Sequence, residues 1–428
     1  MNLKTRLRSL AARHFSSQTY LEKKRAKAVK QRQQKGEPPT VHYFHQADDP
    51  YSHLAVQKLD QLQAAYDVQF RHHLVSQQSA DYLGSADHFD HWALADAASV
   101  ADDYGVQFAP TVTVPDNSAV ACVNAHLAQC LDQPDFAQQA LELGQQLWSG
   151  QSISSQPSTK PVDVVARGNQ LREQLGHYQG AMLYFDGEWF WGIDRMRSLE
   201  LRLIDEGLQL ETGPLCVPEP TPIDTTNLTT SNITLEYFPS LRSPYTAIGH
   251  TRFLDLVKRS GVQVKVRPVM PMLMRGIPAP RAKQRYIIMD SAREGREHGA
   301  PMGKIVDPFG EPVKRAFALF PAMQAQQREL EFVTAYLSAA WVDGVDITTT
   351  SGLQQVVESA GADWSKASAS ADDGQWQTIL QTNLDDMFQS NLWGVPSFRV
   401  SGGHSNQPFA CWGQDRIWRV ENEIARRS

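Results

Sequence analysis

The chain contains two segments that align with each other without a gap, and this internal repeat is the strongest constraint on its fold. The segment VHYFHQADDPYSHLAVQKLDQLQAAYDVQF, which begins at Val41, matches LEYFPSLRSPYTAIGHTRFLDLVKRSGVQV, which begins at Leu235. Near the end of each copy, WGIDR at 191–195 corresponds to WGQDR at 412–416. The identical residues include Tyr43 and Tyr237, Phe44 and Phe238, Pro50 and Pro244, Tyr51 and Tyr245, and Val68 and Val262. The chain is therefore predicted to hold two copies of one domain.

Both copies show the same order of predicted elements. An apolar strand leads through a turn with proline into an amphipathic helix, and a second strand follows, so the two strands should be parallel. A long helical stretch, a short hairpin and a final helix complete each copy. This order predicts an α/β fold with two tandem thioredoxin-like domains, each with an inserted helical subdomain. The predicted parts are a basic helical extension at 1–40, a degenerate domain at 41–205, a linker at 206–231 and a second domain at 232–428.

Charge is distributed unevenly along the chain. Residues 1–36 carry eleven Lys or Arg and one acid, which gives a net charge of +10. The whole chain has a formal charge of −6, so the rest of the chain has a charge of −16. A body this acidic argues against binding of nucleic acid. We interpret LEKKRAKAVKQRQQK at 21–35 as a surface helix with a solvated basic face. The +10 segment at 1–36 is predicted to be dispensable for the active site of the second domain and to act by charge, as an intramolecular clamp on the acidic body or as a partner-binding arm. A transit peptide is the weaker alternative.

The cysteine pattern limits the chemistry. The four cysteines form no C-x-x-C, and so few in a long chain do not make a disulfide framework, so a cytoplasmic protein is expected. Dithiol oxidoreductase chemistry is not predicted, because exchange needs an attacking and a resolving thiol. Cys411 is interpreted as a buried small hydrophobe. His88 and His91 could share a helix face, but no further ligands lie nearby, so no metal site is predicted. No window reaches the roughly 18 apolar residues of a membrane span.

Three motifs of the second copy carry a family resemblance: FPSLRSPYTAIG at 238–249, GVPSF at 394–398 and WGQDRIWRVE at 412–421. In their order and spacing they resemble the DsbA-like superfamily. Within it they resemble the branch of 2-hydroxychromene-2-carboxylate isomerases and kappa-class glutathione transferases. The resemblance covers 232–428 and, more weakly, 41–205. It implies a glutathione-dependent enzyme acting on a small aromatic or unsaturated acid, and it leaves a homodimer open.

Ser243 is the candidate catalytic residue. It precedes Pro244, a residue suited to the first helical turn, so a thiolate there would meet unpaired N–H groups and the positive end of the helix dipole. The hydroxyl can donate one further hydrogen bond and so lower the pKa of an external thiol. The resemblance implies that this thiol is glutathione, because redox-active relatives carry a cysteine at this position. The alternative is that Ser243 only caps the helix.

Five further residues are candidate glutathione contacts by resemblance. Val395 and Pro396 match a cis-proline loop, which would present the Val395 backbone to a peptide-like ligand; an edge-strand proline is the alternative. Gln414 and Asp415 open the last helix, where the family holds the γ-glutamyl end, although Asp is also an ordinary cap. Lys283 resembles a lysine that contacts the glycyl end, or is a solvated lysine in the basic stretch PRAKQR.

The first copy lacks both chemical signatures. Asp49 stands at the Ser243 position and Ala181 at the Pro396 position. A carboxylate repels a thiolate and, when ionised, has no proton to donate, so this copy is predicted to be catalytically inactive. The predicted function is that of a glutathione-dependent isomerase or transferase, with Ser243 stabilising the thiolate for addition to a conjugated electrophile. A non-catalytic tandem thioredoxin-like folding or interaction module is the alternative.

Overall fold

The computed structural model describes residues 1–428 except 78–81, 83–85, 154–160, 227 and 370–373. The chain forms two compact units. The C-terminal unit comprises Met1–Tyr20, Thr221–Pro278 and Ile287–Ser428, and the N-terminal unit comprises Leu21–Pro220 and Ala279–Tyr286. No helix in the described ranges has both the length and the apolar character that crossing a bilayer requires.

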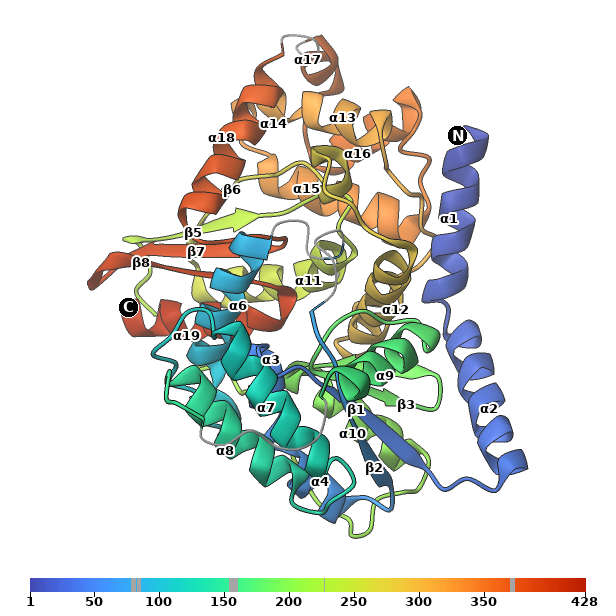
Figure 1. The fold of residues 1–428 in the computed structure, drawn as a ribbon. Helices are drawn as coiled ribbons and strands as arrows, with labels where there is room; N and C mark the ends of the chain where they lie inside the picture. Colours follow the sequence, from blue (N-terminus) through green and yellow to red (C-terminus); the bar gives the residue numbers. More distant parts are fainter. Residues whose placement is uncertain (78–81, 83–85, 154–160, 227, 370–373) are drawn as a thin grey trace. The chain divides into compact units, whose positions relative to one another are not determined.

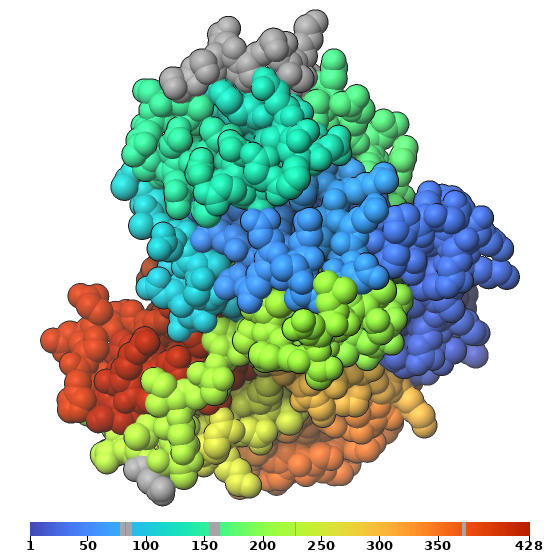
Figure 2. Space-filling view, turned by 90° about the horizontal axis from the view of Figure 1, so that it is seen from below, coloured from blue at the N-terminus to red at the C-terminus, as the bar shows by residue number. Residues whose placement is uncertain are grey.

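The N-terminal unit contains a four-stranded sheet with the order β2-β1-β3-β4. β1 pairs in parallel with β2 and antiparallel with β3. In Figure 2 the helices α7 and α8 of its insert, coloured teal, form one continuous part of its surface. Its elements are α2 (Gln18–Lys35, within the unit from Leu21), β1 (Thr40–His45), α3 (Pro50–Val56), α4 (Leu59–Ala65), β2 (Gln69–Leu74), α6 (Ala86–Val100), η1 (Asp102–Tyr104), α7 (Asn117–Cys130), α8 (Phe136–Trp148), α9 (Pro161–Gln174), β3 (Met182–Phe185), β4 (Glu188–Trp191), η2 (Ile193–Arg195) and α10 (Met196–Asp205).

The C-terminal unit contains a sheet of the same design, with the order β6-β5-β7-β8. β5 pairs in parallel with β6 and antiparallel with β7, and α11 and α19 lie on one face of the sheet (Figure 1). Its elements are α1 (Leu3–Ser16), β5 (Ile233–Phe238), α11 (Pro244–Ser260), β6 (Gln263–Val266), η3 (Met272–Arg275), α12 (Arg281–Glu297, within the unit from Ile287), α13 (Glu311–Ala318), α14 (Phe320–Ala325), α15 (Glu329–Ser338), η4 (Ala339–Asp343), α16 (Thr350–Ser359), α17 (Trp364–Ala369), α18 (Gln375–Gln389), β7 (Ser397–Gly402), β8 (Ser405–Trp412), η5 (Gln414–Arg416) and α19 (Ile417–Arg427).

The expected fold class is confirmed by these two mixed α/β units with helices inserted between the second and third strands. Local sequence explains the elements. β5, ITLEYF, is rich in β-branched and aromatic residues and is buried along most of its length, as a central strand requires. Pro244 starts α11 at a position where its missing N–H costs nothing. Gly261, with φ 64°, ends the helix in the left-handed conformation that glycine adopts without strain.

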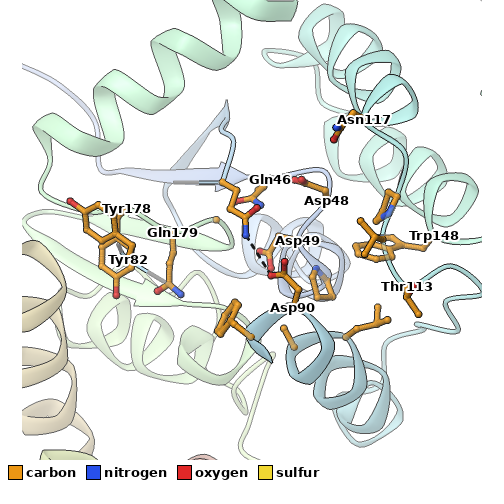
Figure 3. A pocket seen from close by; sticks show the side chains of 18 of the residues that line it. Gln46, Asp48, Asp49, Tyr82, Asp90, Thr113, Asn117, Trp148, Tyr178 and Gln179 are labelled. Atoms are coloured by element: carbon orange, nitrogen blue, oxygen red, sulfur yellow. Dashed lines mark hydrogen bonds between the residues drawn. The ribbon is translucent and has the colours of Figure 1, made fainter. Parts of the chain in front are cut away.

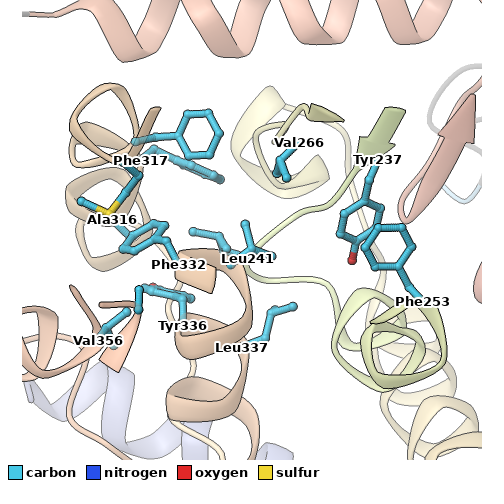
Figure 4. Packing of buried hydrophobic residues seen from close by; sticks show 14 of the residues in the cluster. Tyr237, Leu241, Phe253, Val266, Ala316, Phe317, Phe332, Tyr336, Leu337 and Val356 are labelled. Carbon is cyan, nitrogen blue, oxygen red and sulfur yellow. The ribbon is translucent and has the colours of Figure 1, made fainter. Parts of the chain in front are cut away.

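The core of the C-terminal unit extends from its sheet into the helical insert. Tyr237 of β5 stacks on Phe253 of α11, with ring centroids 4.1 Å apart. In Figure 4, Phe332 and Tyr336 of α15 belong to the same buried cluster. The indole N–H of Trp341 donates to the carbonyl of Leu241 at 3.2 Å. This bond ties the loop after β5, which leads to Ser243, to the insert.

The unit boundaries differ from those drawn on the sequence. The predicted extension at 1–40 is divided, with α1 in the C-terminal unit and α2 in the N-terminal unit from Leu21 onward. The first part of the predicted linker at 206–231 packs on the N-terminal unit, where the N–H groups of Cys216 and Val217 donate to Glu200 at 2.6 and 2.8 Å. Composition alone did not reveal these contacts, because they join residues that are distant in sequence, and local periodicity says nothing about distant partners.

Candidate active site

Three loops of the C-terminal unit meet at the carboxyl end of β5. Phe238, the last residue of β5, lies opposite Ser397, so Pro396 stands beside the end of that strand. The N–H of Gly413 donates to the carbonyl of Pro396 at 2.9 Å, which brings the WGQDR turn to the same place. The third loop leads from β5 into α11. The structure thereby brings together five of the six predicted residues: Ser243, Val395, Pro396, Gln414 and Asp415.

Ser243 is the N-cap of α11. Its Oγ accepts a hydrogen bond from the N–H of Thr246 at 3.2 Å. Ser243 therefore caps the helix, as the alternative interpretation of this serine expected. Accepting that bond leaves the hydroxyl proton free of the cap and available to a second partner. The serine is half-buried, and the first turn of this 17-residue helix has no acidic side chain. An anion at this place would meet the positive end of the dipole.

A pair of arginines next to Ser243 was missed by the sequence analysis. Arg242 donates through Nε to Oδ1 of the buried Asp307 at 2.8 Å, and Arg8 of α1 donates through Nε to Oδ2 at 2.8 Å. Both guanidinium groups also lie over the ring of Phe309, with Cζ 5.1 Å from its centroid for Arg8 and 4.8 Å for Arg242. Two cations on one carboxylate leave an excess positive charge beside the helix N-terminus. No local sequence signal points to Asp307, which lies 65 residues from Arg242.

The loop before β7 contains Val395 and Pro396. The Val395–Pro396 peptide bond is cis. Across the described part of the chain, neither the N–H nor the carbonyl of Val395 takes part in a backbone hydrogen bond, whereas the carbonyl of Pro396 is bound to Gly413. Gly394 lies directly against the indole of Trp412, where an added Cβ would come within 2.2 Å of the ring. Glycine is therefore required at 394 for Trp412 to cover this loop.

Gln414 and Asp415 differ in their surroundings. Gln414 is buried, its Nε2 donates to Glu294 at 3.1 Å, and its backbone carbonyl accepts from Arg252 at 2.9 Å. Its side-chain oxygen also accepts from Arg252, and its Nε2 also donates to Asp415. The side-chain amide of Gln414 is thus bonded to protein partners, one of which is Asp415. Asp415 itself is half-buried.

Lys283 belongs to a different unit from these five residues. It belongs to the segment Ala279–Tyr286 of the N-terminal unit. Its Nζ donates to the carbonyl of Tyr82 at 2.6 Å, and burial lowers its pKa to about 8. Cys411 is buried on β8, as expected for a small apolar side chain.

A second feature that the sequence analysis missed recurs in both units. The hydroxyl of Tyr245, two residues after Ser243, donates to Asp290 of α12 at 2.8 Å. At the aligned place in the N-terminal unit, the hydroxyl of Tyr51 donates to Asp96 of α6 at 2.7 Å. The repeated tyrosine was visible in the alignment, but its acidic partner lies 45 residues away in both cases. These bonds tie the first helix of each copy to its helical insert.

Asp49 occupies the position in the N-terminal unit that Ser243 occupies in the other. It caps α3, accepting from the N–H of Tyr51 at 3.3 Å and of Ser52 at 3.0 Å. Phe44 lies opposite Met182, and the N–H of Gly192 donates to the carbonyl of Ala181 at 2.8 Å, so Ala181 stands where Pro396 stands. Burial raises the pKa of Asp49 to about 6, against the hydrogen bonds from Ser52.

Replacing Asp49 with asparagine should therefore have a pH-dependent effect on stability. Because the folded-state pKa of about 6 exceeds the usual 3.8, the native protein holds the proton more tightly, and wild-type stability falls as the pH rises through this window. If Asp49 were fully desolvated, this pKa difference would change the free energy of unfolding by about 3 kcal/mol. Solvent screening of a half-buried group reduces this change to about 1–2 kcal/mol. The free energy of unfolding of the variant, relative to wild type, should rise by that amount between pH 4 and pH 7.5, measured by urea denaturation.

Asp116→Asn is the matched control for this measurement. Asp116 is the exposed N-cap of α7, and hydrogen bonds from Ser118 lower its pKa. Its carboxylate contributes stability that is lost only as the pH falls towards the acid range. The free energy of unfolding of this variant, relative to wild type, should not increase from pH 4 to pH 7.5. A flat profile for Asp49→Asn as well would contradict the raised pKa of Asp49.

The sheet order, the capped helix and the proline loop define the C-terminal unit as thioredoxin-like. Residues 234–425 match the family model described as the DSBA-like thioredoxin domain. The match covers the C-terminal half only. No curated protein sequence matched the chain significantly.

Several solved structures are similar to part of the chain. A 2-hydroxychromene-2-carboxylate isomerase is 18% identical, with a TM-score of 0.38, 45% of this chain and 95% of that chain covered. The cytosolic disulfide reductase DsbM from Pseudomonas aeruginosa, solved with GSH, is 15% identical, with a TM-score of 0.35 and 46% and 100% covered. The oxidoreductase DsbA from Xylella fastidiosa is 14% identical, with a TM-score of 0.29 and 49% and 93% covered.

Proposed function

We propose that the C-terminal unit binds glutathione and uses it as a nucleophile, as an isomerase or transferase of the 2-hydroxychromene-2-carboxylate isomerase and kappa type. The observation that carries this proposal is the Ser243 hydroxyl, which caps α11 as an acceptor and keeps its proton for a second partner. A thiolate at that place gains a hydrogen bond, the helix dipole and the positive charge of Arg242 and Arg8. Each of these lowers the pKa of a bound thiol.

The remaining contacts suit the peptide part of glutathione. The backbone of Val395, which makes no backbone hydrogen bond within the described residues, would bond to the cysteinyl residue of the ligand, as in strand addition. Asp415, held by Gln414, would bind the γ-glutamyl ammonium. Lys283 has no place in this proposal, because its ammonium is bonded to the carbonyl of Tyr82.

The proposed reaction begins with addition of the glutathione sulfur to a conjugated carbon of an aromatic or unsaturated acid. A C–S bond forms, and the electron pair of the carbon–carbon double bond moves onto the conjugated carbonyl as an enolate. In an isomerase, the former double bond rotates, the enolate pair re-forms it and the thiolate leaves. In a transferase, the enolate takes a proton and the adduct is released. Ser243 acts in both cases by stabilising the thiolate.

Calorimetric titration of the full chain with reduced glutathione tests this proposal, and we expect one equivalent per chain. The N-terminal unit should not contribute a second site, because Asp49 places a carboxylate where the thiolate would lie. S-methylglutathione, which has no ionisable thiol, should bind without the pH dependence of glutathione. Absence of binding would favour the non-catalytic module, and two equivalents would contradict the single site.

An activity measurement distinguishes the two reactions. Benzylidenepyruvate is a suitable conjugated acid, because its absorbance reports the double bond and thiol titration reports the glutathione that remains. Loss of both signals indicates a transferase. Accelerated interconversion of its cis and trans forms with glutathione unchanged indicates an isomerase. Bound glutathione with neither reaction would reject the enzymatic part of the proposal for this class of acid.

A further inference from the structure

An arginine without a counter-charge lies in the C-terminal unit, in the segment that follows β6. Arg275 is the last residue of η3, and it is partly exposed. Within the described ranges its guanidinium group makes no hydrogen bond and no ion pair. Of its three nitrogens only Nε is fully enclosed. The N–H groups on Nη1 and Nη2 are therefore open to a ligand.

Two aromatic side chains contact this guanidinium group. Its Cζ lies 5.8 Å from the ring centroid of Phe388 on α18 and 5.9 Å from that of Trp393, which follows the same helix. The two rings stack on each other, with their centroids 5.8 Å apart and an interplanar angle of 20°. Cation–π contacts orient a guanidinium group, but they do not neutralise its charge. Arg275 is thus held in place with its charge uncompensated.

Burial makes this charge unfavourable in the absence of a partner. It lowers the pKa of Arg275 to about 10, and no acidic side chain of the described residues acts against that shift. The group still carries its charge at neutral pH. Asp386, two residues before Phe388 on α18, is paired with Arg267 at 2.6 Å instead. Partly buried charges in proteins are usually paired, because desolvation is otherwise not compensated. The missing counter-charge therefore points to an anionic ligand.

The aromatic pair adjoins the proposed glutathione site. Trp393 stands two residues before Val395, a separation that the chain spans with at most about 7 Å between the Cα atoms. Phe388 and Val395 also pack against the same small cluster of buried residues, which contains Phe238 at the end of β5. The side chains that orient Arg275 therefore border the loop that contains Pro396.

We propose that Arg275, Phe388 and Trp393 form the subsite that binds the carboxylate of an aromatic acid, the electrophilic substrate of this unit. The two carboxylate oxygens accept from Nη1 and Nη2 of Arg275, whose planar fork fits them. The aromatic ring of the acid packs against Phe388, which is partly exposed. Arg275 then determines the specificity for acids. Its part in the reaction rests on the proposed function, whereas binding of the acid does not require glutathione.

The cavity of the N-terminal unit does not suit the same ligand. Its volume is about 170 Å³, and Asp48 and Asp49, the residue at the Ser243 position, are among the residues that line it (Figure 3). None of its described lining residues is Lys, Arg or His. A carboxylate finds no cationic side chain in that lining, so we expect the chain to bind one equivalent of the acid.

Calorimetric titration of the full chain with trans-cinnamate, in the absence of glutathione, tests this subsite. Cinnamate should bind at least about tenfold more tightly than trans-cinnamamide, because only the acid has a charge for Arg275. It should also bind more tightly than 3-cyclohexylpropanoate, which has the carboxylate but no aromatic ring. Equal binding of cinnamate and its amide, or no binding of cinnamate at millimolar concentration, would overturn the proposal, and Arg275 would then only pack on the two rings.

Variants of the subsite locate the binding. Arg275→Met keeps an apolar side chain on the rings and should weaken cinnamate binding at least about tenfold, whereas Arg275→Lys, which keeps the charge without the planar fork, should lose less. Phe388→Leu should reduce the preference for cinnamate over 3-cyclohexylpropanoate. Arg419→Met is the matched control, because Arg419 of α19 also lies over an aromatic ring, with Cζ 5.2 Å from the centroid of Phe409. It should bind cinnamate like wild type, and an equal loss there would reveal an effect of general charge and contradict the assignment.

Glutathione has carboxylates of its own, so a separate titration distinguishes the two sources. Arg275→Met should bind reduced glutathione as tightly as wild type. A loss of affinity would assign Arg275 to glutathione and overturn the proposal, and γ-glutamylcysteine, which lacks the glycyl carboxylate, would show which end is bound. Glutathione binding without Arg275-dependent binding of cinnamate would reject this inference alone. Arg275-dependent binding of cinnamate by a protein that binds no glutathione would reject the proposed function and leave the subsite standing.

Discussion

Replacing Ser243 with alanine is expected to reduce glutathione-dependent activity about 10²–10³-fold, the usual cost of removing one hydrogen-bond donor to a reacting anion. The thiol pKa of bound glutathione should rise towards its free value of about 8.5, because the hydroxyl no longer stabilises the thiolate. The thiolate absorbance of bound glutathione, titrated against pH, measures this shift directly. Ser243→Thr keeps a hydroxyl and should restore most of the activity.

The alanine variant also loses a helix cap, which costs about 1 kcal/mol of stability. Thr349→Ala is the matched control for that loss. Thr349 caps α16 in the same unit by accepting from the N–H of Gly352 at 3.0 Å. It should lower the free energy of unfolding by a similar amount and leave activity and thiol pKa unchanged. Superimposable thiolate titrations for wild type and Ser243→Ala would show that the serine only caps the helix.

Replacing Asp307 with alanine is expected to destabilise the C-terminal unit by about 3 kcal/mol. The carboxylate is 6% exposed and accepts from Arg8, Arg242 and the N–H of Phe309. Its removal leaves two partly buried guanidinium groups, 36% and 21% exposed, without their counter-charge. Activity should fall as well, because Arg242 adjoins Ser243. Urea denaturation followed by tryptophan fluorescence, with a parallel activity assay, measures both effects.

Glu311→Ala provides the comparison for Asp307. Glu311 pairs with Lys314 at 2.9 Å on the exposed side of α13, and exposed pairs contribute about 0–1 kcal/mol. Deletion of residues 1–16 should resemble Asp307→Ala, because it removes Arg8 and also Ser9, whose Oγ accepts from the N–H of Asp307 at 2.9 Å. This outcome would reverse the expectation from charge that residues 1–36 are dispensable. Equal unfolding curves for Asp307→Ala and Glu311→Ala would contradict the role given to α1.

Local patterns determined much of this protein. The order of strands and helices could be predicted because each element has its own periodicity and its own stop signals, such as Pro244 at the start of α11 and Gly261 after its end. Ser243 could be singled out by its place before a helical proline, and Pro396 by the resemblance of GVPSF to a cis-proline loop. The repeat then predicted that Asp49 and Ala181 stand at the same places in the other unit.

Only the tertiary structure decided what surrounds those residues. Arg8 and Arg242 share Asp307 across 299 and 65 positions of sequence, and Lys283 is bonded 201 positions away, to Tyr82. The net charge of 1–36 suggested a segment that acts by charge and is dispensable for the active site, but the contacts of Arg8 and Ser9 attach α1 to the C-terminal unit. The cavity beside Asp49 likewise depends on walls from several helices. The periodicity of a helix or strand shows which of its faces is buried. The side chains that contact this face come from elements distant in sequence, so only the packing of those elements determines them.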